Sequence, residues 1–209
     1  MALTGRFITL EGGEGVGKST QAEQLAAALR ERGKRVVVTR EPGGTPGAEA
    51  IRALLMTGAA ERWSARAEAL LFAAARSDHV DRVIRPALER GDWVISDRYI
   101  DSTRAYQGGA GAVDDAEILA LHAIACAGLM PDRTLLMKLG SDEATRRATA
   151  RDGAAGDRFA AKGADYHARL DAAFARLSLQ ETRRFRTIDA SGPPESVTAR
   201  LLASIGDLL

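Results

Sequence analysis

One glycine-rich segment constrains the fold of this chain more than any other feature of its sequence. Residues 12–19 read GGEGVGKS and fit the pattern G-x-x-x-x-G-K-[ST]. An apolar run typical of a β-strand precedes the segment at residues 6–10. After it, apolar residues recur at helical spacing through residues 22–29. The sequence therefore predicts a strand, a tight loop and a helix in direct succession.

The alternation of strand-like and helix-like segments continues along the whole chain. The runs rich in β-branched or large apolar residues are 6–10, 35–39, 93–96, 134–139 and 185–189. Longer segments with helical spacing lie between them, and we expect Pro86 to kink or divide the longest one. Because this alternation favours a parallel sheet covered by helices on both faces, the chain is predicted to be one three-layer α/β domain over residues 1–209. A small lid is expected at about residues 147–164, where glycine and charged residues are frequent.

The glycine-rich segment also has the composition of a phosphate-binding loop. Glycines let the backbone curl around an anion with its N–H groups turned inward, and the following helix directs its positive end to the same place. Lys18 would reach the β- and γ-phosphates, and Ser19 would hold Mg²⁺. We therefore expect a P-loop NTPase fold, a five-stranded parallel sheet flanked by helices, that binds a purine nucleoside triphosphate with Mg²⁺. The residues assigned to this site are Gly12, Gly13, Glu14, Gly15, Val16, Gly17, Lys18, Ser19 and Thr20.

Composition narrows the class of protein further. Lys and Arg number 29 and Asp and Glu 28, so the net charge is +1 and nothing indicates binding to nucleic acid or to a membrane surface. Cys126 is the only cysteine, which excludes an intrachain disulfide and fits a reducing compartment. The first apolar run is too short for a signal peptide, and no window approaches the ~20 apolar residues of a membrane span. We expect a cytoplasmic protein.

A second group of charged residues follows the strand expected at residues 93–96. Asp97 and Arg98 stand at the carboxyl end of that strand, where parallel sheets place their ligands. Asp97 would then lie beside Lys18 and Ser19, within reach of a metal ion. Arg98 would face a phosphate. The alternative is an ordinary surface ion pair, but the presence of a P-loop favours the functional interpretation.

Several classes of P-loop protein have to be separated. A GTPase would carry an N/T-K-x-D segment that reads its base, and the sequence has none. A motor or remodelling ATPase would usually be longer and would contain a hydrophobic strand ending in paired acids, which is also absent. Two alternatives stay open beside the interpretation given next. One is a kinase of another nucleotide or deoxynucleoside, and the other is a regulatory or assembly ATPase without a small acceptor.

The chain resembles bacterial thymidylate kinases over nearly its whole length. The matching segments are EGGEGVGKSTQ at 11–21, TREPGGT at 39–45, LLFAAARSDH at 70–79, DRYIDSTRAYQ at 97–107 and DRF at 157–159. P-loops are widely shared, whereas TREPGGT combined with DRY…AYQ is far more specific to this family. The resemblance implies transfer of the γ-phosphoryl group of ATP to dTMP, giving dTDP and ADP for dTTP synthesis. It also implies a homodimer, with the alanine-rich segment 64–84 as a candidate interface and core packing as the alternative.

The resemblance implies a dTMP site built from several segments. Phe72 and Arg76 share a helix face at i, i+4 spacing. Spacing alone favours a core phenylalanine with an arginine at its edge, whereas the resemblance implies stacking on the pyrimidine and a hydrogen bond to a thymine carbonyl. Thr103 and Gln107 would read the base edge, and Tyr106 would pack under the sugar and disfavour a 2′-hydroxyl. The full set is Glu14, Arg40, Pro42, Arg52, Phe72, Arg76, Arg98, Thr103, Tyr106 and Gln107.

Two members of that set have simpler alternatives. Glu14 resembles an acid that touches the 3′-hydroxyl, but from the residues alone it is a variable loop position. Arg52 resembles a further contact to the monophosphate and is equally compatible with an exposed helix surface.

The resemblance also places catalytic charge in the lid. Gly15 occupies the P-loop position at which one type of related enzyme has an arginine, so the extra positive charge is expected elsewhere. Arg151 and Arg158 are the candidates, since phosphoryl transfer depends on positioning and charge neutralisation and a closing lid can bring an arginine to the phosphates. A solvated helix face is the alternative for such arginines. The catalytic set is then Lys18, Asp97, Arg98, Arg151 and Arg158, and the metal set is Ser19 and Asp97.

Overall fold

The computed structural model describes residues 3–59, 61–140, 143, 159 and 162–209. The strands are β1 (Arg6–Glu11), β2 (Val36–Arg40), β3 (Trp93–Asp97), β4 (Arg133–Lys138) and β5 (Phe185–Asp189). The longer helices are α1 (Lys18–Arg30), α2 (Pro46–Met56), α3 (Ala65–His79), α6 (Asp115–Cys126), α8 (Ala164–Gln180) and α9 (Pro194–Ser204). The shorter helical segments are η1 (Val80–Ile84), α4 (Arg85–Glu89), α5 (Ile100–Thr103), η2 (Arg104–Ala110) and η3 (Gly206–Leu208).

The strands form one five-stranded parallel sheet in the order β2-β3-β1-β4-β5, which confirms the predicted architecture. In the register of this sheet, Asp97 at the end of β3 is aligned with Leu10 of β1 and Arg40 of β2. The carboxyl ends of these three strands therefore lie at one edge of the sheet. The functional residues expected after β1, β2 and β3 are brought together at this edge.

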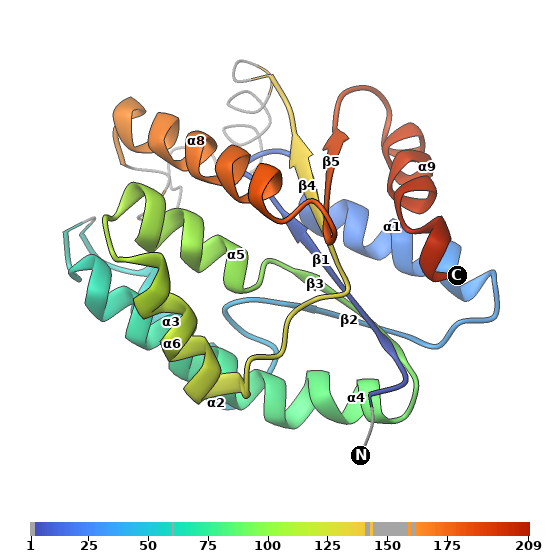
Figure 1. The fold of residues 1–209 in the computed structure, drawn as a ribbon, viewed down its shortest axis with the longest axis horizontal. Helices are drawn as coiled ribbons and strands as arrows, with labels where there is room; N and C mark the ends of the chain where they lie inside the picture. Colours follow the sequence, from blue (N-terminus) through green and yellow to red (C-terminus); the bar gives the residue numbers. More distant parts are fainter. Residues whose placement is uncertain (1–2, 60, 141–142, 144–158, 160–161) are drawn as a thin grey trace.

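Helices cover both faces of the sheet. Helices α1 and α9 pack together on one face, whereas α3, α4, α6 and α8 lie on the other (Figure 1). Neighbouring residues Phe7 and Ile8 of β1 belong to cores on opposite faces, as do Val94 and Ile95 of β3. This alternation follows from the period of a β-strand, in which successive side chains point to opposite sides. Three layers result, with the apolar cores between them.

One helical region agrees with the expectation from the sequence, and another does not. The long segment around Pro86 is divided as expected, because the helix passes through the π-helical turn η1 just before this proline, which lacks an N–H group. Residues 100–110 form the helical pair α5 and η2, which the sequence pattern does not predict. Nearly all of these residues are buried, including polar ones, so no apolar stripe marks a helix there.

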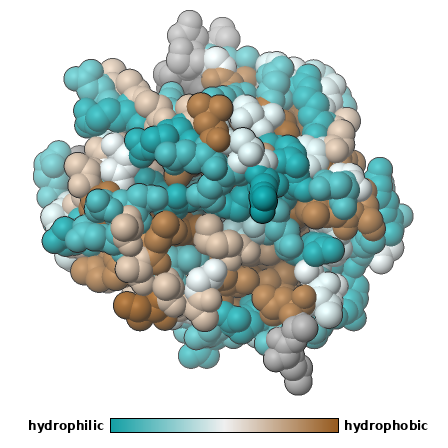
Figure 2. Space-filling view, viewed as in Figure 1, coloured by the Kyte–Doolittle hydropathy of each residue, from teal (hydrophilic) through white to brown (hydrophobic). Residues whose placement is uncertain are grey.

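The surface is mainly hydrophilic on the face shown in Figure 2, with hydrophobic residues among the polar ones in separate groups. Large apolar side chains are nevertheless exposed on four helices: Leu54 of α2, Leu70 of α3, Ile124 of α6 and Leu179 of α8. Within the part of the chain that the structure describes, no helix combines the length and the apolar character needed to cross a membrane.

Candidate active site

The P-loop lies between the end of β1 and the start of α1, which confirms its predicted context. Gly12, Gly15 and Gly17 have φ angles of 135°, 72° and 91°, in the region that favours glycine. At Gly12 a Cβ atom would lie 2.4 Å from the carbonyl oxygen of Met137, so the loop crosses β4 too closely for a larger residue. Gly17 is the N-cap of α1 and offers no side chain to the first N–H groups of the helix. Those groups can donate to an anion bound at the loop.

The Lys18 side chain is buried at the centre of this loop. Its Nζ donates to the carbonyl oxygens of Gly12 at 3.2 Å and Gly13 at 2.6 Å. Burial, and next the positive charge of Arg98, lower the pKa of Lys18 from 10.5 to about 8. A lysine whose pKa is lowered by burial needs anionic partners to keep its positive charge, and the phosphates of a bound nucleotide would supply them.

Ser19 and Asp97 are joined beside Lys18. The Ser19 hydroxyl donates to Oδ2 of Asp97 at 2.5 Å. A hydroxyl and a carboxylate are ligands that suit Mg²⁺, which proteins usually hold through one or two carboxylates together with substrate phosphates and water. The described residues include no group of three or more His, Cys, Asp or Glu that could hold a metal ion. One hydroxyl and one carboxylate are a donor set that could share such an ion with a phosphate ligand.

Arg98 adopts an unusual backbone conformation directly after β3. Its φ angle is 71°, in the left-handed region that non-glycine residues seldom occupy. Its N–H donates to the carbonyl oxygen of Leu10 at 3.0 Å, and its carbonyl oxygen accepts from Ser96 Oγ at 2.7 Å. These bonds hold the turn in place, and the turn projects the guanidinium over the P-loop. Such retained strain is frequent at functional sites.

The Arg98 guanidinium connects the P-loop with η2. It donates to the carbonyl oxygen of Gly12 and to Ser102 Oγ, each at 3.1 Å, and to Glu14 Oε1 at 2.6 Å. The Tyr106 ring lies under it at 5.1 Å, and the Tyr106 hydroxyl also donates to Glu14. Although burial opposes the charge, the neighbouring Tyr106 and Glu14 raise the pKa of Arg98 above its usual value. This cation stays charged at every pH of interest.

Glu11, the last residue of β1, is a buried acid that lies under this turn. Its Oε1 accepts from the N–H groups of Tyr99 at 2.8 Å and Ser102 at 3.2 Å, and its Oε2 accepts from Ser102 Oγ at 2.6 Å. Burial, and next the charge of Asp101, raise the pKa of Glu11 from 4.5 to about 7, with Arg98 opposing. Glu11 thus supports the turn that carries Arg98.

Replacing Glu11 with glutamine should make stability less dependent on pH. Folding raises the pKa of this carboxyl from 4.5 to about 7, so the folded state binds the proton more tightly than the unfolded chain does. The stability contributed by that proton is complete below the unfolded pKa and is lost as the pH rises through the folded pKa. We expect wild type to lose about 2–3 kcal/mol of unfolding free energy from this group between roughly pH 5 and pH 8, since one pKa unit corresponds to ~1.4 kcal/mol.

Urea denaturation at these two pH values measures this loss. Glu11→Gln should lack it, whereas Glu117→Gln, which changes a half-exposed acid of α6, should behave as wild type. Equal losses in wild type and in Glu11→Gln would show that Glu11 does not titrate in this range.

At the other end of the site, Arg76 of α3 is held by buried partners. Its Nε donates to Glu41 Oε2 at 2.7 Å and its Nη2 to Thr103 Oγ1 at 2.9 Å. Glu41 also lies 3.2 Å from Nδ1 of His79, whose Nε2 is 2.6 Å from Thr39 Oγ1. A carboxylate can only accept here, so Nδ1 of His79 carries a proton. This network fixes the guanidinium of Arg76 at the end of β2 and beside α5.

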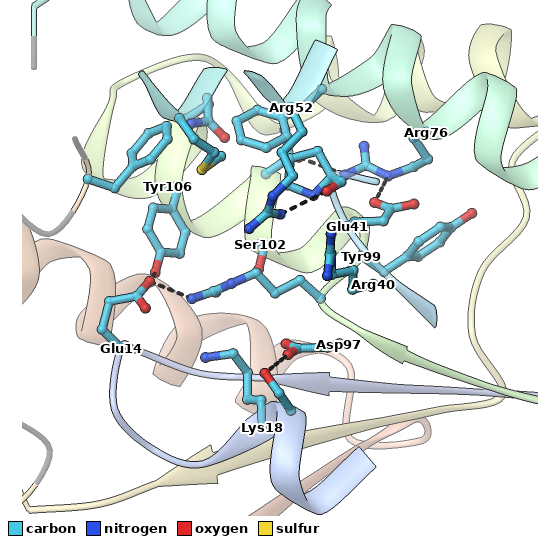
Figure 3. Close-up of a pocket in the computed structure, with 18 of the residues that line it drawn as sticks. Glu14, Lys18, Arg40, Glu41, Arg52, Arg76, Asp97, Tyr99, Ser102 and Tyr106 are labelled. Carbon is cyan, nitrogen blue, oxygen red and sulfur yellow. Dashed lines mark hydrogen bonds and ion pairs between the residues drawn. The ribbon is translucent and has the colours of Figure 1, made fainter. Parts of the chain in front are cut away.

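A pocket of about 580 Å³ extends between these two ends. Figure 3 shows Lys18 and Asp97 at one end of it and Arg76 with Glu41 at the other. All the residues assigned to the dTMP site line this pocket: Glu14, Arg40, Pro42, Arg52, Phe72, Arg76, Arg98, Thr103, Tyr106 and Gln107. The structure therefore brings the predicted acceptor residues together, and their contacts with a ligand stay predictions.

Arg40 and Arg52 line the wall of the pocket nearest to β2 and α2. Arg40 pairs with Glu49 at 3.0 Å and is largely exposed. Arg52 donates from Nη1 to the carbonyl oxygen of Pro42 at 2.8 Å. Arg52 is therefore part of the pocket wall rather than an isolated arginine on an outer helix surface.

The lid arginines cannot be placed in the same way. Arg151 and Arg158, like Arg146 and Arg147, lie outside the described residues. Phe159, next to them, is described and is 4% exposed. Its ring centroid lies 5.8 Å from that of Tyr106 and 6.1 Å from that of Phe72, so it joins the pocket lining.

Several residues of the site are not predicted by the sequence patterns. Glu11 and Glu68 hold functional side chains from behind, whereas Ser102 and Met56 line the pocket. The sequence offers a partial signal for Glu41, an acid that cannot be buried cheaply without a partner. For Glu11 a similar signal exists, because an acid at the end of an apolar strand directly precedes the P-loop.

A second pocket, of about 370 Å³, lies on the other side of the P-loop. The segment between β5 and α9 contributes Ala190, Gly192 and Pro194 to its lining. Gly15, Gly17, Lys18 and Ser19 line both pockets. Phosphate groups that enter from the two sides would therefore meet at Lys18. A parallel sheet, a P-loop and two pockets that share its lysine define the class as a P-loop nucleotide-binding protein with room for a second ligand.

Comparisons with known proteins identify the family. The thymidylate kinase family model matches residues 10–201. A thymidylate kinase of Rhizorhabdus wittichii is 59% identical over 207 residues, covering 99% of this chain and 100% of the relative, and one of Caulobacter vibrioides is 50% identical over 197 residues, covering 94% of each. The crystal structure of thymidylate kinase from Ehrlichia chaffeensis matches with a TM-score of 0.77 and 29% identity, covering 96% of this chain and 98% of that one. The chain belongs to the thymidylate kinase family.

Proposed function

We propose that the larger pocket binds dTMP with its phosphate toward Lys18 and its base toward Arg76, while ATP occupies the smaller pocket. Membership of the thymidylate kinase family gives the reaction, which is ATP-dependent phosphorylation of dTMP to dTDP. The observation that carries the arrangement of substrates is the lining common to the two pockets. It would bring the γ-phosphate of the donor and the phosphate of the acceptor together at one lysine, as direct transfer requires.

The nucleoside of dTMP is expected at the end of the pocket formed by α3 and η2. Phe72 would stack on the thymine ring and Arg76 would donate to a thymine carbonyl, with Thr103 and Gln107 along the base edge. Tyr106 would pack under the deoxyribose. Its hydroxyl already donates to Glu14 at 3.1 Å, which supports a role for that acid near the 3′-hydroxyl.

Charge neutralisation would dominate the chemical step. The acceptor phosphate is already anionic, so the reaction needs no general base. Lys18 and Arg98 line the same pocket and would lie where charge accumulates on the transferred group, and such preorganised cations lower the barrier. Binding of phosphates would also replace the carbonyl partners of Lys18 and raise its pKa. Arg151 and Arg158 would add positive charge from the lid, and Arg40 and Arg52 would bind the monophosphate.

Mg²⁺ is the expected cofactor. Ser19 and Asp97, with their oxygens 2.5 Å apart, would hold it directly or through its water shell together with the phosphates of ATP. The bound ion would supply neutralisation of the phosphate charge.

Changing Asp97 to asparagine should raise the Mg²⁺ concentration needed for half-maximal rate by about 10-fold or more, because outer ligands of metal sites contribute that much to affinity. Titration of Mg²⁺ at saturating ATP and dTMP measures this. Asp114→Asn is the matched control, because asparagine also serves as the N-cap of α6. An unchanged Mg²⁺ requirement in Asp97→Asn would contradict the assignment of the metal ligands.

A coupled assay that measures the release of ADP, run with different nucleoside monophosphates as acceptors, tests the proposed dTMP kinase activity. We expect the highest kcat/KM with dTMP. Strong turnover with dUMP, CMP or AMP and none with dTMP would overturn the assignment. A regulatory ATPase would instead hydrolyse ATP without regard to dTMP. A rise in melting temperature on adding dTMP would argue against that class, because a ligand of the native state stabilises it.

A homodimer and a cytoplasmic location complete the proposal. Leu70 of α3 is 53% exposed, and α3 packs on α6, which exposes Ile124. Apolar side chains of this size on adjacent helices support an interface between two copies of the chain. Sedimentation at several protein concentrations tests the dimer. Cys126 is a free, buried thiol, which suits a reducing compartment.

A further inference from the structure

Glu68 stands behind the base end of the pocket without lining it. Helix α3 presents Glu68, Phe72 and Arg76 at intervals of four residues, so the three lie on one face. Phe72 and Arg76 line the pocket, whereas Glu68 is 1% exposed and contacts Gln107 of η2. Gln107 Nε2 donates to Glu68 Oε2 at 2.9 Å, and both side chains are buried.

This contact fixes the orientation of an amide. The two ends of a glutamine amide differ in chemistry but have nearly the same shape, so hydrogen bonds alone decide which end faces which neighbour. A carboxylate accepts and cannot donate, so it selects the NH₂ end of Gln107. The carbonyl oxygen Oε1 is then the end left for a ligand in the pocket that Gln107 lines. A neutral amide at position 68 would accept or donate and would permit both orientations.

Glu41 acts in the same way on Arg76. It accepts from Nε at 2.7 Å, while Thr103 accepts from Nη2 at 2.9 Å. The guanidinium has five N–H groups, so others remain to donate into the pocket. Two buried acids, Glu41 and Glu68, thus hold one donor side chain and one acceptor side chain that line the same pocket.

We propose that Glu68 is a positioning residue that makes the site select a thymine edge over a cytosine edge; this inference rests on the proposed function. Thymine offers a carbonyl oxygen at position 4 and an N–H at position 3, which match the donor Arg76 and the acceptor Gln107 Oε1. Cytosine offers an amino group and an unprotonated nitrogen at the same positions. It would place donor against donor and acceptor against acceptor, and buried polar groups left unpaired cost much of the binding free energy.

A comparison of three substrates separates selection of the base edge from other effects on activity. 5-Methyl-dCMP differs from dTMP only at positions 3 and 4 of the base, and dUMP differs only by the missing methyl group. In Glu68→Gln we expect the ratio of kcat/KM for dTMP to that for 5-methyl-dCMP to fall about 10-fold or more, mainly through KM. The ratio of kcat/KM for dTMP to that for dUMP should change less than about 2-fold, because both bases present the same edge. Glu117→Gln, the same chemical change on an exposed part of α6, should leave both ratios unchanged.

An exchange of the two residues provides the decisive variant. In Glu68→Gln/Gln107→Glu, the new carboxylate at position 107 accepts from the new amide and still presents an acceptor to the base. Selection of dTMP over 5-methyl-dCMP should return to within about 3-fold of wild type. If the single variant Glu68→Gln folds poorly, the double variant still tests the proposed role of Glu68. Equal loss of activity toward all three substrates, or no recovery in the exchange, would overturn the role of Glu68. A wild type inactive on dTMP would instead overturn the proposed function.

Discussion

Replacement of Lys18 by alanine is expected to lower kcat for dTMP by about 10³-fold or more without unfolding the protein. Preorganised cations at a transferring phosphoryl group are worth at least this much in related chemistry. The side chain is buried at the point shared by the two pockets, and the hydrogen bonds of its Nζ within the described residues go to the carbonyl oxygens of Gly12 and Gly13. Its loss would therefore remove charge from the reacting groups and little from the core.

Stability distinguishes this expectation from simple damage to the fold. Because burial lowers the pKa of Lys18 to about 8, the folded state disfavours its charge, and the variant should melt at the same temperature as wild type or higher. Single-turnover rates with saturating ATP and dTMP measure the chemical step, and thermal melting measures the fold. Lys34→Ala is the control, since Lys34 is remote from both pockets and bonds the carbonyl oxygen of Leu209. A variant that kept a tenth of the wild-type rate would rule out the catalytic role of Lys18.

Substitution of Arg98 should give the second largest loss of activity. Two variants distinguish the role of its charge from that of its backbone conformation. Arg98→Gly and Arg98→Ala both remove the guanidinium from Gly12, Glu14 and Ser102, so both should lose about 10³-fold in kcat/KM for dTMP. Glycine accepts a φ angle of 71° freely, whereas alanine does not. Arg98→Gly should therefore be more stable than Arg98→Ala by about 1 kcal/mol.

Urea denaturation of the two Arg98 variants, combined with initial rates over a range of dTMP concentrations, gives both quantities. Arg32→Ala is a suitable control, because Arg32 lies just after α1, lines neither pocket and donates to the carbonyl oxygen of Ala28 at the surface. If alanine were as stable as glycine at position 98, the left-handed turn would not be strained. If either variant kept wild-type kcat/KM, Arg98 would not contact the acceptor.

The fold was predictable because its signals are local. A strand of this sheet is a short apolar run between breakers, so the run at 134–139 is found as β4 at Arg133–Lys138, one residue away. The P-loop pattern is specific because it has a fixed spacing and lies between a predicted strand and a predicted helix. The structure confirms this strand and this helix. The order of the strands in the sheet is not local, but the rule that parallel strands carry ligands at their carboxyl ends was enough to place Asp97 and Arg98 at that edge.

The supporting residues were not predictable for the opposite reason. Glu68 and Gln107 are 39 residues apart in the chain, and Glu41 and Arg76 are 35 apart. A single sequence gives no signal that such polar residues meet in the interior. Hydrophobic periodicity does not predict the pair α5 and η2, because its buried face includes charged and amide side chains, which such a pattern counts as surface. The roles of the ten acceptor residues rested on family resemblance more than on spacing.

One backbone atom connects the two cations of the site. The carbonyl oxygen of Gly12 accepts from both Lys18 Nζ and Arg98 Nη1. A phosphate that draws either cation away from this oxygen changes the environment of the other. Occupancy of one pocket should therefore alter the affinity of the second. Thermodynamic linkage requires the effect to be mutual: the factor by which the donor nucleotide changes the dissociation constant of dTMP equals the factor by which dTMP changes that of the donor.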